Sequence, residues 1–528
     1  MSNPEPTSGQ ATHTSTEWPA VGQRVSTEDC RQGTVRYRGT VDGTADEWVG
    51  VEWDNPAWGK HSGELHGRVY FSCRTPNSGS FVRSSKLMPP RSFLQALRAR
   101  YTDFGIAKHD LQLSLGGDSK VVVETVGWDK LNREQSQLDR LRVAGLIRQG
   151  ILFADAPGEI AETAPAIVDL DLSENLFTSW EVIVDICREL KHLEQLELNT
   201  NRLDPLPPVP QFSDAFANLR VLSLSNTDIS WSEACRLGPS VPRLTTFSLG
   251  SNSLTQLDVE PSVAAEAFPH LTNLSLDNNA LSDWQQLESL SQLPCLQQLN
   301  LRANYFVEIT APTSGFKQLT SLNISKNRVA TVYSVDQLDA YPALDALTIH
   351  GNPALDASGT EQARVMVIAR VGRIKTLNGS EIERKEREDS EMYYLSHFVA
   401  GFANADEEER QSKYPRYREL CQKYGTPAVS QTSKETVLDD HVTVTLRDAM
   451  RGPTLKSAKH RILGTSTIRS LKNILQRSLR VPAHKQELYC VTKASDKDEL
   501  LWIPMDHDLR EVNYYNVQRG DELAVVAS

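Results

Sequence analysis

No hydrophobic stretch of this sequence approaches the roughly 20 apolar residues that a membrane-spanning helix requires. The first 18 residues are polar and lack the apolar centre of a secretory signal peptide, so we expect the chain to remain in the cytoplasm. The seven cysteines are scattered, and no two of them form a C-x-x-C pair. We therefore expect reduced thiols rather than a disulfide framework or a metal site.

The motifs of common catalytic sites are also absent. The sequence contains no G-x-x-x-x-G-K-[ST], no H-E-x-x-H and no G-x-S-x-G. Gly59-Lys60 is followed by a histidine and lacks the upstream glycine of a phosphate-binding loop. The histidines and cysteines do not have the spacing of metal ligands. We predict a protein that is not an enzyme and that binds neither a metal nor another cofactor.

A basic surface large enough for nucleic acid is not expected in the middle of the chain. The formal net charge of the whole sequence is −12. Residues 151–380 hold 27 Asp and Glu against 14 Lys and Arg, an acidic excess of 13 that accounts for essentially the whole imbalance. This composition argues against nucleic acid as the ligand of that region.

The most regular feature present is a repeated L-x-x-L-x-L-x-x-N pattern between Ile167 and Asn352. It occurs eight times at spacings of 23 to 27 residues, with Thr227 in place of one asparagine. This period is typical of leucine-rich repeats. In each repeat the L-x-L pair predicts a short strand with its leucines buried, and the asparagine predicts a turn whose backbone groups need a partner. Because no repeat buries its own apolar face, the repeats must stack into a curved α/β solenoid.

The outward residues of these strands predict a surface for a protein partner. The first repeats present acidic side chains, and the middle repeats present neutral polar ones. A merely solvated surface is the alternative interpretation. The predicted contacts of this surface are Asp169, Asp171, Glu194, Glu197, Ser248, Ser275 and Asn300. We expect the solenoid to be least regular at Thr227.

The last 90 residues have a different pattern. HVTVTLRD at His441–Asp448 alternates as a strand, and Ile468–Leu479 has a helical period with Ile474 among the residues of its apolar face. ELYCVTK and ELAVVAS predict later strands. The order strand, helix, strand resembles the ubiquitin-like family, which implies an α+β β-grasp domain that docks partners.

Composition divides the chain into six predicted segments. Residues 91–150 include a predicted strand at Val121–Trp128 and a predicted helix at Leu131–Arg148, and residues 425–438 have linker composition. The predicted segments are a disordered N-terminus at 1–19, a small β-domain at 20–90, a connector at 91–150, the repeats with their C-terminal cap at 151–384, a charged helical linker at 385–438, and the ubiquitin-like domain at 439–528.

The segment 21–90 is dense in glycine, aromatic and β-branched residues, which predicts a small β-barrel. It contains EWVGVEWD, WGKHSG, GRVYFSC and GSFVRSSKL in that order. These motifs resemble the CAP-Gly family, whose members bind the acidic, aromatic C-terminal tails of α-tubulin and of some microtubule-end proteins. The family signature G-K-N-D-G reads Gly59-Lys60-His61-Ser62-Gly63 in this sequence, with both glycines and the lysine matched.

We predict a tail-binding site in this segment. Glycines let a ligand backbone approach closely, aromatic side chains can form a slot, and Lys60 can pair with a carboxylate. Leu65 to Arg91 contains five basic residues and no acidic one, so this strip would attract a glutamate-rich peptide. In so small a domain Trp53 and Phe71 could equally be core residues. The predicted site residues are Trp48, Trp53, Gly59, Lys60, His61, Gly63, Phe71, Gly79, Phe81, Arg83 and Lys86.

The order of the three domains resembles the tubulin-folding cofactor E family. This resemblance implies a non-enzymatic, cytoplasmic and cytoskeleton-associated chaperone. It would bind α-tubulin and act with tubulin cofactors B, C and D to assemble or dissociate the αβ heterodimer. Two alternatives stay open: a microtubule-end scaffold protein, or a ubiquitin-pathway adaptor that binds the proteasome or ubiquitin receptors through the C-terminal domain.

Overall fold

The computed structural model describes most of the chain as two compact units. The described residues are 19–44, 46–102, 137–208, 210, 212–313, 315–356, 360–425, 442–447, 452–464, 466–493, 500–515, 517 and 522–527. The first unit comprises Met1–Tyr305 and Pro312–Leu319, and the second comprises Phe306–Ala311 and Thr320–Ser528. Most of the predicted disordered N-terminus, the strand predicted at Val121–Trp128, and the linker residues 426–438 lie outside the described residues.

The first unit begins with an antiparallel β-domain. Its five-stranded sheet has the order β6-β3-β2-β1-β7, and a separate hairpin pairs β4 with β5. Alternate residues of β3 point inward, so that Val49, Val51 and Trp53 join a buried core. The strands are β1 (Arg24–Thr27), β2 (Gln32–Thr40), β3 (Glu47–Trp53), β4 (Glu64–Leu65), β5 (Arg68–Val69), β6 (Gly79–Val82) and β7 (Leu87–Met88).

Helix α1 (Phe93–Tyr101) anchors the β-domain to the first repeats within the same unit. A capping box between Ser92 and Gln95 starts the helix, and its first-turn residues Phe93 and Leu94 are buried. Asp155 accepts hydrogen bonds from the Ser92 hydroxyl at 2.5 Å and from the Leu94 backbone N–H at 2.7 Å. Strand β8 (Arg91–Ser92) pairs in parallel with β10 (Ile151–Phe153), which adds backbone contacts to the same anchor.

The repeat sheet begins inside the predicted connector. The helix predicted at Leu131–Arg148 is wrong for its described part, because Val143–Gly145 forms strand β9 beside β11. Ala144 and Leu146 are buried on alternate positions, as strand geometry requires. Pairing with β11 overrides the local helical composition, and the predicted start of the repeats at residue 151 is therefore too late.

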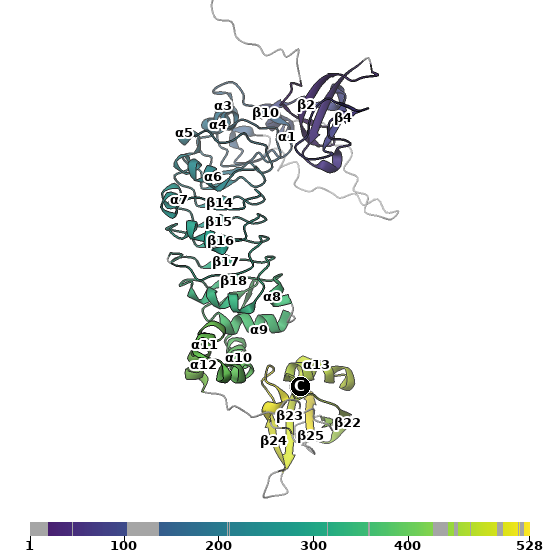
Figure 1. Ribbon diagram of the computed structural model, residues 1–528, viewed down its shortest axis with the longest axis vertical. Coiled ribbons are helices and arrows are strands. Elements are labelled where there is room, and N and C mark those ends of the chain that lie inside the picture. Colours follow the sequence, from purple (N-terminus) through teal and green to yellow (C-terminus); the bar gives the residue numbers. More distant parts are fainter. Residues whose placement is uncertain are drawn as a thin grey trace, which may run out of the picture. The chain divides into compact units, whose positions relative to one another are not determined.

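The remaining repeats of the first unit follow the predicted pattern. The first apolar residue of each L-x-L pair is the middle residue of a three-residue parallel strand, and the second directly follows the strand; both are buried. Figure 1 shows β14, β15 and β16 stacked in order. The segment Trp284–Leu290 forms a 3-10 helix. The elements are β11 (Asp169–Asp171), β12 (Gln195–Glu197), β13 (Val221–Ser223), β14 (Thr246–Ser248), β15 (Asn273–Ser275), β16 (Gln298–Asn300), α3 (Glu159–Thr163), α4 (Trp180–Glu189), α5 (Ser213–Phe216), α6 (Trp231–Leu237) and α7 (Pro261–Ala267).

The asparagine ladder is buried and hydrogen-bonded. Asn252 donates from Nδ2 to the Leu224 carbonyl at 2.8 Å and accepts from the Thr227 backbone N–H at 2.8 Å. The Thr227 hydroxyl donates to the same Leu224 carbonyl at 2.8 Å. The expected irregularity at Thr227 is wrong in one respect, because β13 keeps a three-residue register with both neighbours. The Thr227 hydroxyl supplies one of the hydrogen bonds to the turn that an asparagine amide would otherwise donate.

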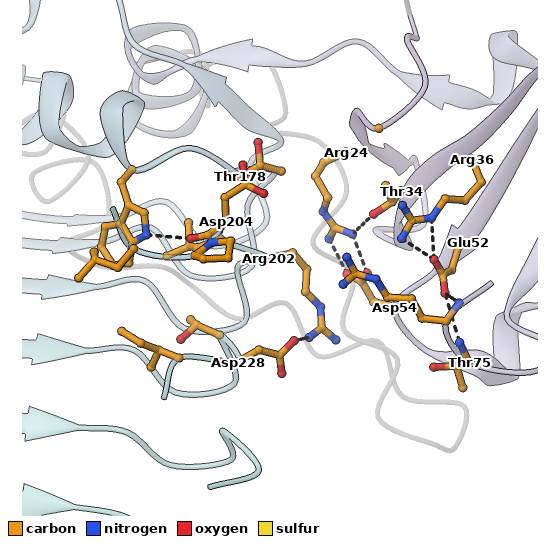
Figure 2. A pocket seen from close by; sticks show the side chains of 18 of the residues that line it. Arg24, Thr34, Arg36, Glu52, Asp54, Thr75, Thr178, Arg202, Asp204 and Asp228 are labelled. Carbon is orange, nitrogen blue, oxygen red and sulfur yellow. Dashed lines mark hydrogen bonds and ion pairs between the residues drawn. The ribbon is translucent and has the colours of Figure 1, made fainter. Parts of the chain in front are cut away.

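A polar cavity of about 500 Å³ lies where the β-domain faces the first repeats. Figure 2 shows Arg24, Arg36 and Glu52 on one wall and Arg202 and Asp228 on the other. The opposite charges pair within each wall: Arg24 with Asp54 at 2.5 Å, Arg36 with Glu52 at 2.7 Å, and Arg202 with Asp228 at 2.6 Å. These three pairs neutralise much of the charge in the lining of the cavity.

The second unit contains the last repeats and their cap. Strands β17 (Ser321–Asn323), β18 (Ala346–Thr348) and β19 (Thr376–Leu377) are parallel, and β20 (Ser380–Glu381) closes the sheet as an antiparallel hairpin. The hairpin lies at the end of the predicted segment 151–384, where the C-terminal cap of the repeats is expected. Helices α8 (Pro353–Asp356) and α9 (Thr360–Arg370) lie between β18 and β19 in the chain.

Residues 384–425 form packed helices, so the predicted linker character is wrong for this part. Helices α10 (Arg384–Asn404), α11 (Glu407–Lys413) and α12 (Tyr417–Tyr424) follow one another, and a buried cluster joins α9, α10 and α12. The buried Glu391 carboxylate pairs with Arg416 at 3.2 Å and with Lys423 at 2.8 Å. The charged residues thus serve internal contacts as well as solubility.

The C-terminal domain is the predicted β-grasp. Its mixed sheet has the order β22-β21-β25-β23-β24, with β21 parallel to β25. Helix α13 spans the predicted Ile468–Leu479, but Ile474 is 52% exposed and does not belong to the buried face. The strands are β21 (Val442–Arg447), β22 (Thr454–His460), β23 (Gln486–Lys493), β24 (Leu500–Pro504) and β25 (Glu522–Ala527). Among the helices that the structure describes, none combines the length and apolar composition of a membrane crossing.

Candidate functional site

The G-K-H-S-G segment is held against the start of β6. The backbone N–H groups of Lys60 and His61 both donate to the Gly79 carbonyl, at 2.7 and 3.1 Å, and the Gly79 N–H donates back to the His61 carbonyl. The Ser62 hydroxyl accepts from the Asn77 N–H at 2.9 Å, so serine supplies an acceptor at this position. The Lys60 side chain is exposed and free to reach a ligand beside this rigid loop.

Glycines make room for the Phe71 ring. A Cβ at Gly50 would lie 2.4 Å from the ring, and one at Gly79 would lie 3.0 Å from it. Gly63 has a φ of +101°, and a Cβ there would meet the Phe71 carbonyl at 1.9 Å. Any larger residue would displace the ring or the backbone. A Cβ at Gly59 would likewise meet the Asn77 carbonyl at 2.0 Å.

Around Phe71 the structure assembles an aromatic cluster on the outer face of the sheet. Phe81 is half-buried and lies edge-on to Phe71, Tyr70 and Tyr37 at centroid distances of 5.4, 5.4 and 6.0 Å. The His61 ring lies 5.1 Å from Phe81. Phe71 is only 7% exposed and therefore forms the floor, whereas Phe81 and His61 present the accessible edge. Such edges suit an aromatic ligand side chain.

The histidine of the motif is held in its neutral form. Its Nδ1 accepts a hydrogen bond from the Gly63 backbone N–H at 3.0 Å, which places the ring proton of the neutral imidazole on Nε2. Burial, together with the nearby Lys60 ammonium, lowers the pKa of His61 below its usual value. The Nε2–H is then a donor that a ligand carboxylate can accept beside Lys60.

Trp48 and Arg83 extend the same face. Trp48 lies in β3 and Arg83 directly follows β6, and the Arg83 guanidinium lies 4.0 Å from the centre of the Trp48 ring. Arg83 also pairs with Asp46 at 2.5 Å, which partly offsets its charge. Lys86 is exposed in the turn before β7, outside the aromatic cluster.

Two features of the predicted slot need correction. Trp53 is 5% exposed and packs in the domain core with Val25, Val35 and Leu87, so it does not form a wall of the slot. Its inward position follows from the strand period, since Val49, Val51 and Trp53 alternate. Tyr37 and Tyr70 belong to the cluster but were not predicted. Tyr37 reaches the Phe71 ring through the pairing of β2 with β3, which places it opposite Gly50.

A second candidate surface is a polar row across the repeat sheet of the first unit. The parallel register aligns one position of each strand from β11 to β16. Five strand steps of about 4.8 Å give this row a length of roughly 24 Å. The row consists of Asp171, Glu197, Ser223, Ser248, Ser275 and Asn300, and Asp169 lies in the adjacent row beside Gln195.

The acidic end of this row holds destabilised carboxylates. Burial, with the charge of Asp171 added, raises the pKa of both Asp169 and Glu197. The other end is a neutral hydrogen-bonded line, in which Asn300 donates to the Ser275 hydroxyl at 2.8 Å. A cationic group from a partner would offset the carboxylate repulsion at the acidic end. Hydrogen-bonding groups would pair with the neutral side chains at the other end.

Glu194 does not belong to this row. It precedes β12 by one residue and lies 3.6 Å from Arg220 at the edge of the sheet. There it lines a separate shallow hollow among basic side chains such as Arg142 and Arg243. The sequence analysis grouped Glu194 with Asp171 and Glu197, but the strand register places Glu194 outside β12 and outside the polar row.

Comparisons with known proteins identify relatives of the whole chain and of its terminal domains. The sequence pattern of the CAP-Gly domain family matches residues 21–87. The chain is 33% identical over 519 residues to tubulin-specific chaperone E of Xenopus laevis, covering 94% of this chain and 97% of that protein. It is 30% identical over 497 residues to tubulin-folding cofactor E of Arabidopsis thaliana, covering 90% and 92%. Its C-terminal part is similar to the solution structure of the ubiquitin-like domain of mouse tubulin-specific chaperone E, at 21% identity and a TM-score of 0.15, covering 19% of this chain and 94% of that one.

Proposed function

This chain belongs to the tubulin-specific chaperone E family, and we propose that it binds α-tubulin and acts as a chaperone of the αβ heterodimer. The β-domain binds the acidic α-tubulin tail, and the polar row of the repeats contacts the folded body. Linking two modest sites raises the effective concentration at the second site once the first is occupied. With tubulin cofactors B, C and D, the chain assembles or dissociates the heterodimer without catalysing a reaction itself.

The observation that carries this proposal is the combination of Lys60, His61 and Phe81 at one exposed edge. A tail that ends in a carboxylate and an aromatic side chain needs a cation, a donor and an aromatic contact within a few ångströms. Lys60 supplies the cation, His61 Nε2–H supplies the donor, and Phe81 supplies the ring edge. The glycines beneath keep this edge accessible to a ligand backbone.

The test measures the affinity of a labelled peptide that ends in Glu-Glu-Tyr. Lys60→Glu should weaken binding by about tenfold or more, since it replaces an attraction by a repulsion at the carboxylate. Lys86→Glu carries the same charge change outside the aromatic cluster and should have a much smaller effect. Equal losses in the two variants would mean that only the diffuse basic strip attracts the peptide, and an unchanged Lys60→Glu affinity would remove Lys60 from the site.

A microtubule-end scaffold is the second candidate, because the same slot could hold the tails of assembled tubulin. That function predicts co-sedimentation with microtubules and an intact heterodimer after mixing. A ubiquitin-pathway adaptor instead predicts binding to proteasomes or ubiquitin receptors that survives deletion of residues 1–90. Both the chaperone and the scaffold place the α-tubulin tail in the same slot, so the fate of the heterodimer after mixing distinguishes them.

A further inference from the structure

The C-terminal β-grasp domain has its charges divided between two halves. Residues 449–486 contain nine Lys and Arg and no Asp or Glu. Residues 487–528 contain four Lys and Arg against nine Asp and Glu. The basic half supplies β22 and α13, and the acidic half supplies β23, β24 and β25. So strong a separation gives the domain one face with a positive potential.

This basic face is centred on β22 and the C-terminal half of α13. The Lys456 ammonium donates to the Ser478 carbonyl at 2.6 Å, which brings the edge strand against the end of the helix. Arg477 and Arg480 are exposed beside this contact, and Lys459 is exposed on the same edge strand with its side chain on the opposite face of the sheet. Lys472 lies elsewhere on the helix, because it pairs with Asp508 at 2.8 Å. The exposed cations therefore form the basic face, whereas Lys472 is paired with a carboxylate of the acidic half.

Exposed apolar side chains accompany these cations. Leu455 is 62% exposed and Ile474 is 52% exposed. The register of β22 against β21 shifts between Leu446 and Arg447, which leaves Leu455 as the extra residue of a bulge. A bulge turns a side chain out of its ordinary place in the sheet. Ile474 lies one helical turn before Arg477 and Ser478, beside the position that Lys456 reaches.

The edge of the sheet is also open at this face. Within the described residues β22 is the terminal strand, with β21 on its inner side. Lysines and a bulge on an edge strand often serve only to prevent aggregation. That explanation does not account for Leu455 and Ile474, because exposed leucine and isoleucine would promote the contacts that such protection avoids.

The domain is attached to the rest of its unit at the other end of α13. His507 Nδ1 lies 3.2 Å from the Asp389 carboxylate of α10, and Arg510 donates to the Met392 sulfur at 3.7 Å. The backbone N–H of Ile468, in the first turn of α13, donates to the Arg510 carbonyl at 2.9 Å. A helix of 12 residues is about 18 Å long, so the attachment leaves the basic end of the helix uncovered.

We propose that the edge of the domain formed by Leu455, Lys459, Ile474, Arg477 and Arg480 binds an extended, acidic polypeptide segment that carries an apolar residue. The cations pair with Asp or Glu side chains, and Leu455 with Ile474 contacts the apolar residue. An extended chain also matches the open backbone edge of β22. This inference goes beyond the proposed tubulin function and does not depend on it.

The test uses the full chain and a labelled peptide of glutamate and leucine, acetylated and amidated so that it lacks a terminal carboxylate and an aromatic residue. The double variant Lys459→Glu/Arg477→Glu should weaken peptide binding by about tenfold. The matched control Arg302→Glu/Lys317→Glu changes the charge equally at exposed repeat positions and should stay within about twofold. Equal losses in the two double variants would overturn the proposal, since the peptide would then respond only to net charge.

Two further measurements define the ligand. Leu455→Ser/Ile474→Ser keeps every charge and should still weaken binding several-fold, and hydrogen exchange should show protection of Thr454–His460 when the peptide binds. No loss in this variant and no protection would overturn the proposed face. A single-stranded oligonucleotide that binds more tightly than the peptide, and loses affinity in Lys459→Glu/Arg477→Glu, would replace the polypeptide by a nucleic acid.

Discussion

The imidazole Nδ1 of His61 accepts a hydrogen bond from the backbone N–H of Gly63 at 3.0 Å, within the loop that carries Lys60. This bond requires a neutral ring, and burial with the Lys60 charge lowers the pKa of His61 from its usual value. Because the unfolded chain takes up the proton first as the pH falls below about 6.5, the contribution of His61 to stability is lost in acid rather than in base.

The first prediction concerns this titration. NMR of the histidine ring should give His61 a pKa below about 6.5, and Lys60→Gln should raise it by removing the neighbouring positive charge. His61→Asn keeps a side-chain acceptor for the Gly63 N–H but does not titrate. In this variant, protection of the Gly63 amide from hydrogen exchange should no longer fall in acid. A His61 pKa at or above the usual value would contradict the neutral, hydrogen-bonded ring.

The second prediction concerns the space beneath Phe71. Gly50→Ala adds a Cβ that would lie 2.4 Å from the ring, so Phe71 must move and disturb Phe81 above it. Affinity for the Glu-Glu-Tyr peptide should fall by about tenfold or more. Gly145→Ala is the control, since the nearest atom to its Cβ would be the Tyr101 hydroxyl at 4.0 Å. Tail affinity that survives Gly50→Ala, with the β-domain still folded, would place the tail elsewhere.

The third prediction concerns the acidic end of the polar row. Asp171→Asn removes a charge that raises the pKa of Asp169 and of Glu197, so both values should fall. Raised carboxyl pKa values mean that stability is lost as the pH rises through them, and Asp171→Asn should therefore stabilise the repeats at neutral pH. Asp277→Asn, beyond β15 on the same sheet, should leave both pKa values unchanged. Carboxyl NMR titrations that show no difference between the two variants would refute the coupling.

The fourth prediction concerns the threonine rung. The Leu198 carbonyl already accepts a hydrogen bond from the Asn201 amide. Thr227→Asn adds a second amide donor toward this carbonyl and should raise the free energy of unfolding by about 1 kcal/mol. The reverse change at the next rung, Asn252→Thr, removes the amide that bonds Leu224 and Thr227 and should destabilise by a similar or larger amount. Denaturation by urea measures both. A neutral Thr227→Asn would mean that the hydroxyl already satisfies the turn.

Local periodicity predicted the elements whose environment is repeated along the chain. The buried ladder at Asn252 and the bounds of α13 follow from spacings of about one repeat and one helical turn. Ile474 departs from that pattern because only the packing of α13 decides where its buried stripe ends. The helix expected near Leu131–Arg148 failed for a similar reason, since pairing with β11 makes Val143–Gly145 a strand.

The side chains that cluster at the candidate site were harder to predict than the loop that carries the motif. The motif identified Lys60 and the glycines, because their chemistry and spacing are local. Tyr37 joins the cluster through cross-strand pairing, and Trp53 leaves it through strand alternation. Long-range register decides both, and a single sequence does not specify register.

The proposed function requires that this chain binds α-tubulin and acts on the αβ heterodimer. The most direct measurement mixes purified full-length chain with αβ-tubulin and follows the species by size, with and without tubulin cofactor B. We predict loss of the heterodimer peak and a complex of the chain with α-tubulin, both reduced by Lys60→Glu. A heterodimer that stays intact under both conditions, with no complex containing α-tubulin, would contradict the account.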